Sequence, residues 1–174
     1  RIPAPFLMPS PCYRLRPVTE FDRELLLRIY GSTRIDELAR VDWSDADKAR
    51  FVETQFDAQA QHYADVYPDG QYDVIESAAG EPIGRLYLHR GRRDLRVIDI
   101  ALLPAWRGQG LGSRVLDDVL VEAAATSRVV SIHVEIFSPA QRLYERLGFV
   151  PVETRGLYRL MQWTPLQYPE VRHG

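Results

Sequence analysis

The most informative segment of the chain is RGQGLGS, residues 107–113, which lies between an apolar run and an amphipathic segment. Glycines at alternate positions allow the backbone to approach a ligand closely and to turn its N–H groups toward it. The helix expected after this loop points the positive end of its dipole at the same place. Gln109, Leu111 and Ser113 would contribute mainly backbone N–H groups, and Arg107 a positive charge. The segment therefore predicts an anion site, and phosphate is the usual occupant.

Two common phosphate-binding motifs do not match this loop. A P-loop ends in Gly-Lys-Ser/Thr, and no Lys follows the glycines here. The dinucleotide fingerprint Gly-x-Gly-x-x-Gly needs a glycine where Ser113 stands, and it belongs after the first strand of its unit. A glycine-rich turn that only packs a helix on a strand is the remaining alternative.

Hydrophobic periodicity on both sides of the loop predicts one α/β domain with a mixed sheet and helices on its faces. The expected order is β-α-α-β-β-β-α-β-α-β-β. Strands are predicted at 13–18, 71–77, 83–89, 95–103, 129–136, 149–153 and 157–163. Helices are predicted from Thr19 to a stop at Gly31, from Ser44 to about Asp65, after Gly112, and from Pro139 to Leu147. Strand 95–103 is expected to be buried almost throughout, apart from Arg96 and Asp99.

Composition excludes several classes of protein. The 174 residues include 22 Lys+Arg and 24 Asp+Glu, so a net charge of −2 gives no bulk attraction to nucleic acid or to an acidic membrane. No apolar run approaches the ~20 residues of a membrane span. Cys12 is the single cysteine, which suits a reducing cytoplasm, and the histidines lack partners at metal-ligand spacing, so no metal site is expected. We expect a proline-rich lead-in at 1–12, the domain at 13–163 and a tail at 164–174.

At two places the sequence resembles the GCN5-related N-acetyltransferase (GNAT) superfamily. Arg107, Gly110 and Gly112 match its acetyl-CoA pyrophosphate pattern, Arg/Gln-x-x-Gly-x-Gly/Ala. Its second signature, Ala-x-x-Leu-Tyr-x-x-x-Gly-Phe, is reproduced by Ala140, Leu143, Tyr144, Gly148 and Phe149. The expected element order agrees over about residues 13–163. In one departure, Phe137 and Ser138 stand where family members often have asparagine, and Ser138 retains a hydroxyl donor.

The resemblance implies a GNAT fold and acetyl-CoA as co-substrate. It also implies that strand 95–103 diverges from strand 129–136, that the thioester lies in the gap, and that a backbone N–H polarises its carbonyl. The residues expected to bind the cofactor are Leu102, Leu103, Arg107, Gly108, Gln109, Gly110, Leu111, Gly112, Ser113, Ser138 and Ala140.

Tyr144 is the family-matched general acid toward the departing thiolate, and its alternative role is an aromatic that fills the sheet face. Asp99 interrupts an apolar run, where an unpaired carboxylate is costly to bury, so it is the first candidate base. It is equally suited to a salt bridge with Arg96 or Arg85. His133 and Glu135 are further candidates, and water is another.

On the second helix, Gln55, Gln59 and His62 share one face and are predicted to bind the acceptor, although an ordinary solvated edge has the same pattern. The expected function is acetyl transfer to a primary amine of a small molecule, amino acid or peptide. A non-catalytic acyl-CoA sensor or partner-binding module is the alternative. Strand 157–163 is expected to be an exposed edge that pairs across a homodimer.

Overall fold

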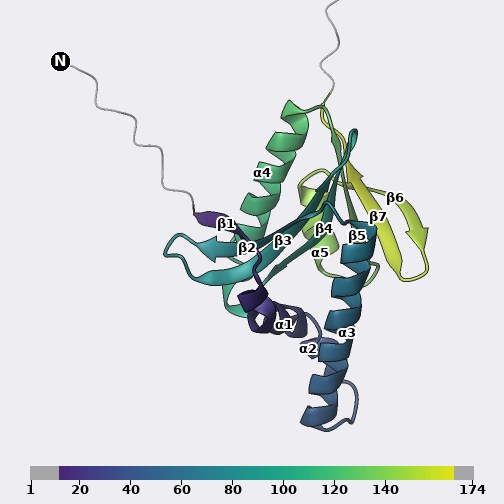
Figure 1. The fold of residues 1–174 in the computed structure, drawn as a ribbon. Helices are drawn as coiled ribbons and strands as arrows, with labels where there is room; N and C mark the ends of the chain where they lie inside the picture. The colour runs from purple at the N-terminus through teal and green to yellow at the C-terminus, as the bar shows by residue number, and fades with distance from the viewer. Residues whose placement is uncertain (1–11, 167–174) are drawn as a thin grey trace, which may run out of the picture.

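The computed structural model describes residues 12–166, which form one mixed sheet with helices on both faces (Figure 1). Its strands are β1 (Tyr13–Pro17), β2 (Gln71–Ser77), β3 (Pro82–Arg90), β4 (Asp94–Leu102), β5 (Val129–Glu135), β6 (Val150–Arg155) and β7 (Tyr158–Trp163). They lie in the order β1-β2-β3-β4-β5-β7-β6, and within this sheet β4 and β5 are the parallel pair. The predicted class is confirmed, and so is the order of elements, apart from an additional short helix at Ile35–Leu38. The expected lead-in and tail fall almost wholly outside the described residues.

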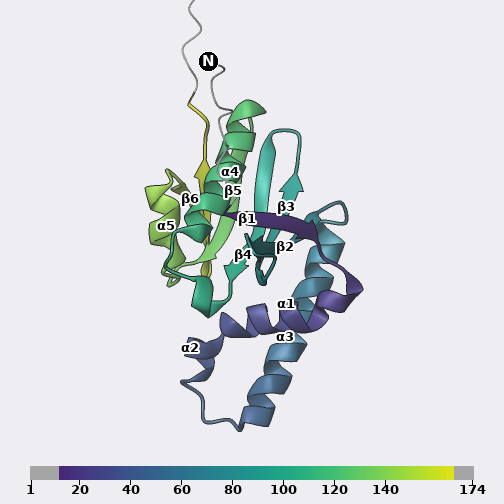
Figure 2. The same cartoon turned by 90° about the vertical axis from the view of Figure 1, so that its left-hand side faces the viewer.

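The helices form two groups on opposite faces of the sheet, as Figure 2 shows. They are α1 (Arg23–Ser32), α2 (Ile35–Leu38), α3 (Asp45–Val66), α4 (Leu111–Ala125) and α5 (Ala140–Arg146). Under α4 and α5 lies the larger core cluster, which includes the predicted apolar face of α4. A smaller cluster joins α1 to α3 and β3 through Ile29, Tyr30, Phe56 and Tyr87. Among residues 12–166, no helix is long and apolar enough to cross a membrane.

Helix α3 begins where its capping residue predicts. Ser44 Oγ accepts a hydrogen bond from the backbone N–H of Asp47 at 3.1 Å, which starts α3. The predicted stop at Gly31 is wrong, since α1 continues to Ser32. A Cβ on Gly31 would lie 3.3 Å from Val52 Cγ1, so this glycine lets α1 pack closely on α3.

Two predictions about strands are also wrong. β7 lies between β5 and β6, so it is not an edge strand, and the exposed strand at that end of the sheet is β6. β4 is not buried along its length: only Leu95 and Val97 are fully buried. The reason is that β4 pairs with β5 only as far as Val97↔Ile132, after which the two strands separate.

Candidate active site

The gap between β4 and β5 is accompanied by a bulge that reorients β4. Tyr87 pairs with Asp99 but Leu88 pairs with Val97, so Ile98 is an extra residue. Simple alternation from Val97, which packs under α4, would place Asp99 on the same face. The bulge turns it toward α3 instead, where Tyr63 contacts it.

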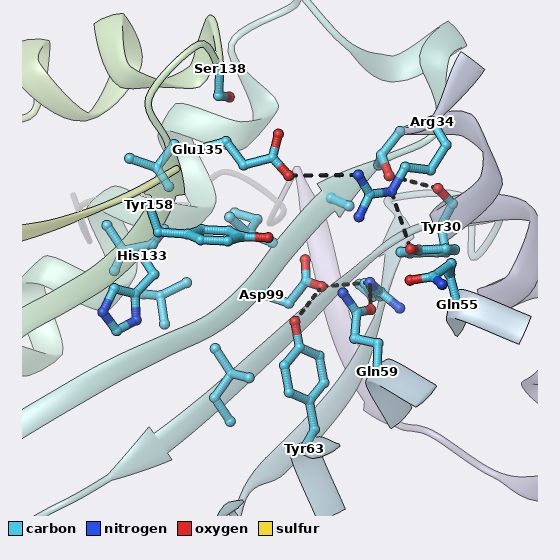
Figure 3. A pocket seen from close by; sticks show the side chains of 18 of the residues that line it. Tyr30, Arg34, Gln55, Gln59, Tyr63, Asp99, His133, Glu135, Ser138 and Tyr158 are labelled. Atoms are coloured by element: carbon cyan, nitrogen blue, oxygen red, sulfur yellow. Dashed lines mark hydrogen bonds and ion pairs between the residues drawn. The ribbon is translucent and has the colours of Figure 1, made fainter. Parts of the chain in front are cut away.

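A cavity of about 1050 Å³ lies at this gap, between the diverging strands and helices α1–α3 (Figure 3). It is lined by both charged and aromatic side chains. Eight of the candidate acceptor-binding, catalytic, base and cofactor residues meet in its wall: Gln55, Gln59, His62, Asp99, His133, Glu135, Ser138 and Tyr144. The sequence-predicted acceptor, catalytic and alternative base residues are thus brought together, whereas the glycine loop lies outside this cavity.

Asp99 forms the salt bridge with Arg85 that was one of its two expected roles. Asp99 Oδ2 accepts from Arg85 Nη2 at 2.5 Å and from Tyr63 Oη at 3.3 Å. The same arginine nitrogen donates to Gln59 Oε1 at 2.9 Å, and the Arg85 side chain is only 3% exposed. Within residues 12–166 no hydrogen bond engages Asp99 Oδ1, and Figure 3 shows this oxygen pointing away from the Arg85 contact. One carboxylate oxygen is therefore fixed and the other is free to receive a ligand.

Tyr144 reaches the cavity from α5 and is almost fully buried. Its ring packs against Phe149, with 5.8 Å between centroids. Burial, and secondarily the negative charge of Asp99, raise the pKa of Tyr144 to about 12. The hydroxyl therefore remains protonated at neutral pH and is able to donate a hydrogen bond.

The other two candidate bases each face an arginine. His133 Nδ1 lies 2.9 Å from Arg96 Nη1. A guanidinium only donates, so we assign Nδ1 as the acceptor and the proton of the neutral ring to Nε2. Burial, and then the Arg96 charge, lower the pKa of His133, so the ring is neutral but its lone pair is used. Glu135 faces Arg34, with 3.6 Å between Oε1 and Nη1.

The glycine loop has the geometry expected of an anion site. Gly108 and Gly110 have φ values of 70° and 82°, and a Cβ on either would meet no atom within 4 Å. The first bond of α4 joins Arg114 N–H to the Gly110 carbonyl at 3.0 Å. The N–H groups of residues 111–113 consequently have no partner within the helix. This open loop with free donors fits the diphosphate of a coenzyme A derivative.

Part of the backbone that was expected to bind the cofactor, around Leu102 and Leu103, makes contacts within the protein instead. Arg107 donates to the Leu102 carbonyl at 2.8 Å and to Ser32 Oγ at 2.9 Å, so it fastens the loop to β4 and α1. The Leu103 N–H donates to the Ile83 carbonyl at 2.8 Å. Because backbone groups alternate along a strand, the N–H groups of Leu102 and Ile100 face the open β5 side.

Ser138 and Ala140 lie at the start of α5. Ser138 Oγ accepts a hydrogen bond from the Ala140 N–H at 3.2 Å, which leaves the serine hydroxyl proton available for donation. Ser138 also lines the cavity.

Among the cavity residues that the sequence did not single out are Tyr30, Arg34 and Tyr158. Tyr30 follows the apolar spacing of its helix, Arg34 sits among other charged residues, and Tyr158 belongs to a strand. None of these three residues lies at a spacing that indicates a functional site.

Within residues 12–166, no group of three or more His, Cys, Asp or Glu side chains is placed to hold a metal ion.

Residues 68–151, which include the glycine loop and α5, match the family model described as an acetyltransferase (GNAT) domain. Residues 68–151 therefore have the sequence of a GNAT acetyltransferase domain. Such domains use acetyl-CoA as their co-substrate. The Arg107–Gly112 loop and the Tyr144 signature both lie within the matched residues of this GNAT domain.

Solved structures share the fold of this chain over most of its length. The PaiA N-acetyltransferase of Thermoplasma acidophilum, in complex with coenzyme A, is 13% identical, with a TM-score of 0.66 over 87% of this chain and 98% of that one. An acetyltransferase from Thermus thermophilus is 21% identical, with a TM-score of 0.63 over 90% and 99%. The spermidine N-acetyltransferase of Vibrio cholerae, with CoA and spermine, is 18% identical, with a TM-score of 0.59 over 88% and 95%. No curated protein matches the chain in sequence.

Proposed function

We propose that this protein is an acetyl-CoA-dependent N-acetyltransferase that acetylates a primary amine of a small molecule, amino acid or peptide by direct transfer. The observation that supports it most strongly is the cavity at the β4–β5 gap, where Asp99 and Tyr144 meet. When bound, acetyl-CoA supplies an activated acetyl thioester. The residues of the chain position the co-substrate and the acceptor and transfer the protons.

The glycine loop and β4 position the co-substrate. The free N–H groups of residues 111–113 and the positive end of the α4 dipole bind the diphosphate. The open edge of β4 presents the N–H groups of Ile100 and Leu102 along the gap. One of them donates to the thioester carbonyl, where it stabilises the negative charge that develops during transfer.

Asp99 and Tyr144 handle the acceptor and the protons. An alkyl ammonium has a pKa of about 10.4, so the acceptor must lose a proton before it attacks. Asp99 Oδ1 accepts a hydrogen bond from the amine, orients it, and passes the proton to water in the cavity. The protonated Tyr144 hydroxyl donates to the departing sulfur.

A non-catalytic acyl-CoA-binding module is the second candidate. The observation that favours it is the Asp99–Arg85 salt bridge, which makes one carboxylate oxygen unavailable as a base. The protonated Tyr144 in the cavity wall favours the enzyme instead.

The test is release of the coenzyme A thiol from acetyl-CoA with a panel of primary amines, with products identified by mass. Tyr144→Phe should lower kcat by about 10²–10⁴-fold, the usual contribution of a positioned proton donor. Its affinity for acetyl-CoA, measured by calorimetry, should stay unchanged, because the ring and its packing remain. Tight acetyl-CoA binding with no acetylated amine in any class would favour the binding module.

A further inference from the structure

The acceptor side of the cavity has two arginines against one aromatic ring. The guanidinium carbons of Arg34 and Arg85 lie 5.3 Å and 6.0 Å from the centroid of Tyr30. Arg85 is committed to Asp99 and Gln59. Arg34 lies in the connection between α1 and α2 and faces Glu135 of β5 across the cavity (Figure 3). It therefore stands between the helical wall and the strand wall.

Arg34 has donors that the protein does not use. Its Nε donates to Tyr30 Oη at 3.1 Å and its Nη1 to Glu37 Oε2 at 2.9 Å. Glu135 approaches the same Nη1, and 3.6 Å is longer than a hydrogen bond. Among the described residues, no hydrogen bond engages Nη2. A guanidinium has five N–H donors in a planar fork that matches a carboxylate, so a second, well-placed carboxylate has room to bind.

The charges of the cavity disfavour a polycationic acceptor. Five arginines and four carboxylates line it. Asp99 is paired with Arg85, and Glu37 and Glu135 both contact Arg34. A polyamine would require a surplus of unpaired carboxylates. This wall has none: Arg155 pairs with Glu153 outside it, and the other four arginines match the four carboxylates in number.

We propose that the acceptor has a carboxylate of its own, as an amino acid does, and that Arg34 binds this carboxylate while Asp99 Oδ1 receives the amine. This inference rests on the proposed acetyl transfer. The substrate carboxylate takes the unused Nη2 and replaces the long contact with Glu135. Transfer then forms an amide bond between the acetyl carbon and the amine nitrogen and breaks the thioester C–S bond. One proton from the neutral amine ends on the sulfur, and the products are an N-acetylamino acid and free coenzyme A.

The test compares amino acids with their own amides and with the corresponding decarboxylated amines. The best amino acid should exceed its amide by about 10- to 100-fold in kcat/KM, as expected for charge-assisted hydrogen bonds. Arg34→Gln should remove this preference, chiefly by raising KM for the acid, so that the acid and its amide are acetylated with similar kcat/KM. The matched control is Arg40→Gln, an exposed arginine of the same cavity, which should keep the preference.

A second measurement separates binding from chemistry. The acetylated form of the best acid is titrated into enzyme saturated with coenzyme A, and it should bind at least about 10-fold more weakly to Arg34→Gln than to the parent. Acetylation of amines and amides as efficient as that of acids would overturn the carboxylate inference while the acetyltransferase proposal stood. An equal slowing of every acceptor by Arg34→Gln would also overturn it. If no acceptor of any class is acetylated, both proposals fall.

Discussion

Removing the Asp99 carboxylate should leave a buried guanidinium without its counter-charge. Arg85 is 3% exposed, and its Nε is already buried without a hydrogen-bond partner. Deleting one partner of a buried ion pair costs about 3–5 kcal/mol. Gln59 and the ring of Tyr87, 5.0 Å from the guanidinium carbon, remain as partial compensation. We therefore expect Asp99→Ala to lower the free energy of unfolding by about 3 kcal/mol, at the lower end of that range.

In a domain of this size that loss lowers Tm by about 6–12 °C, which thermal and urea unfolding followed by circular dichroism will resolve. The control is Asp36→Ala, an exposed carboxylate of the same cavity, which should stay within about 0.5 kcal/mol of the parent. The double variant Asp99→Ala/Arg85→Met removes both charges and should recover at least half of the loss. A loss below about 1 kcal/mol in Asp99→Ala, or simple additivity in the double variant, would refute this reasoning.

Stability measurements also test three other positions. Gly84→Ala should lower the free energy of unfolding by about 1–3 kcal/mol, because its Cβ would lie 2.4 Å from the backbone oxygen of Ala101. Urea unfolding of this variant at the wild-type midpoint would contradict the close approach of β3 and β4. At Gly112 an added Cβ would meet its nearest atoms only at 3.9 Å, so Gly112→Ala should instead raise the free energy of unfolding by about 0.5 kcal/mol in the same assay. Arg16 lowers the pKa of Asp22 below its ordinary 3.8, so the stability from this pair is complete above about pH 4 and is lost as the pH falls further. Asp22→Asn should unfold more easily at pH 7 and approach the parent between about pH 4 and 2, and a gap independent of pH would count against the pair.

The sequence predicted those parts of the molecule that depend on local chemistry. Ser44 caps α3 because its hydroxyl accepts a nearby N–H, and Gly110 permits a positive φ wherever the fold places it. The apolar face of α4 follows directly from helical spacing. Such features need no knowledge of distant residues.

Features set by strand pairing were not predictable. The extra residue at Ile98, which turns Asp99 toward α3, appears only when β4 is aligned with β3. The insertion of β7 between β5 and β6 likewise depends on which strands pair, because the chain order of the last two strands is compatible with either arrangement.

The acceptor side was the least predictable part of the site. Arg34 and Glu135 are far apart in the sequence and meet only because α1 and β5 form opposite walls of one cavity. Arg107 was expected to face the anion, but its guanidinium instead joins Ser32 and the end of β4. A long, flexible side chain has many possible partners, and spacing alone does not select among them.

Calorimetric titration of acetyl-CoA tests most directly whether the glycine loop binds the co-substrate. Gly110→Glu places a carboxylate at the α4 N-terminus, and Gly110→Ala is its control, since both variants share the strain of a side chain at φ 82°. We predict clear binding to the parent, and at least about 10-fold weaker binding to Gly110→Glu than to Gly110→Ala. Absence of binding to folded parent protein at millimolar acetyl-CoA, or equal affinity of the two variants, would contradict the account.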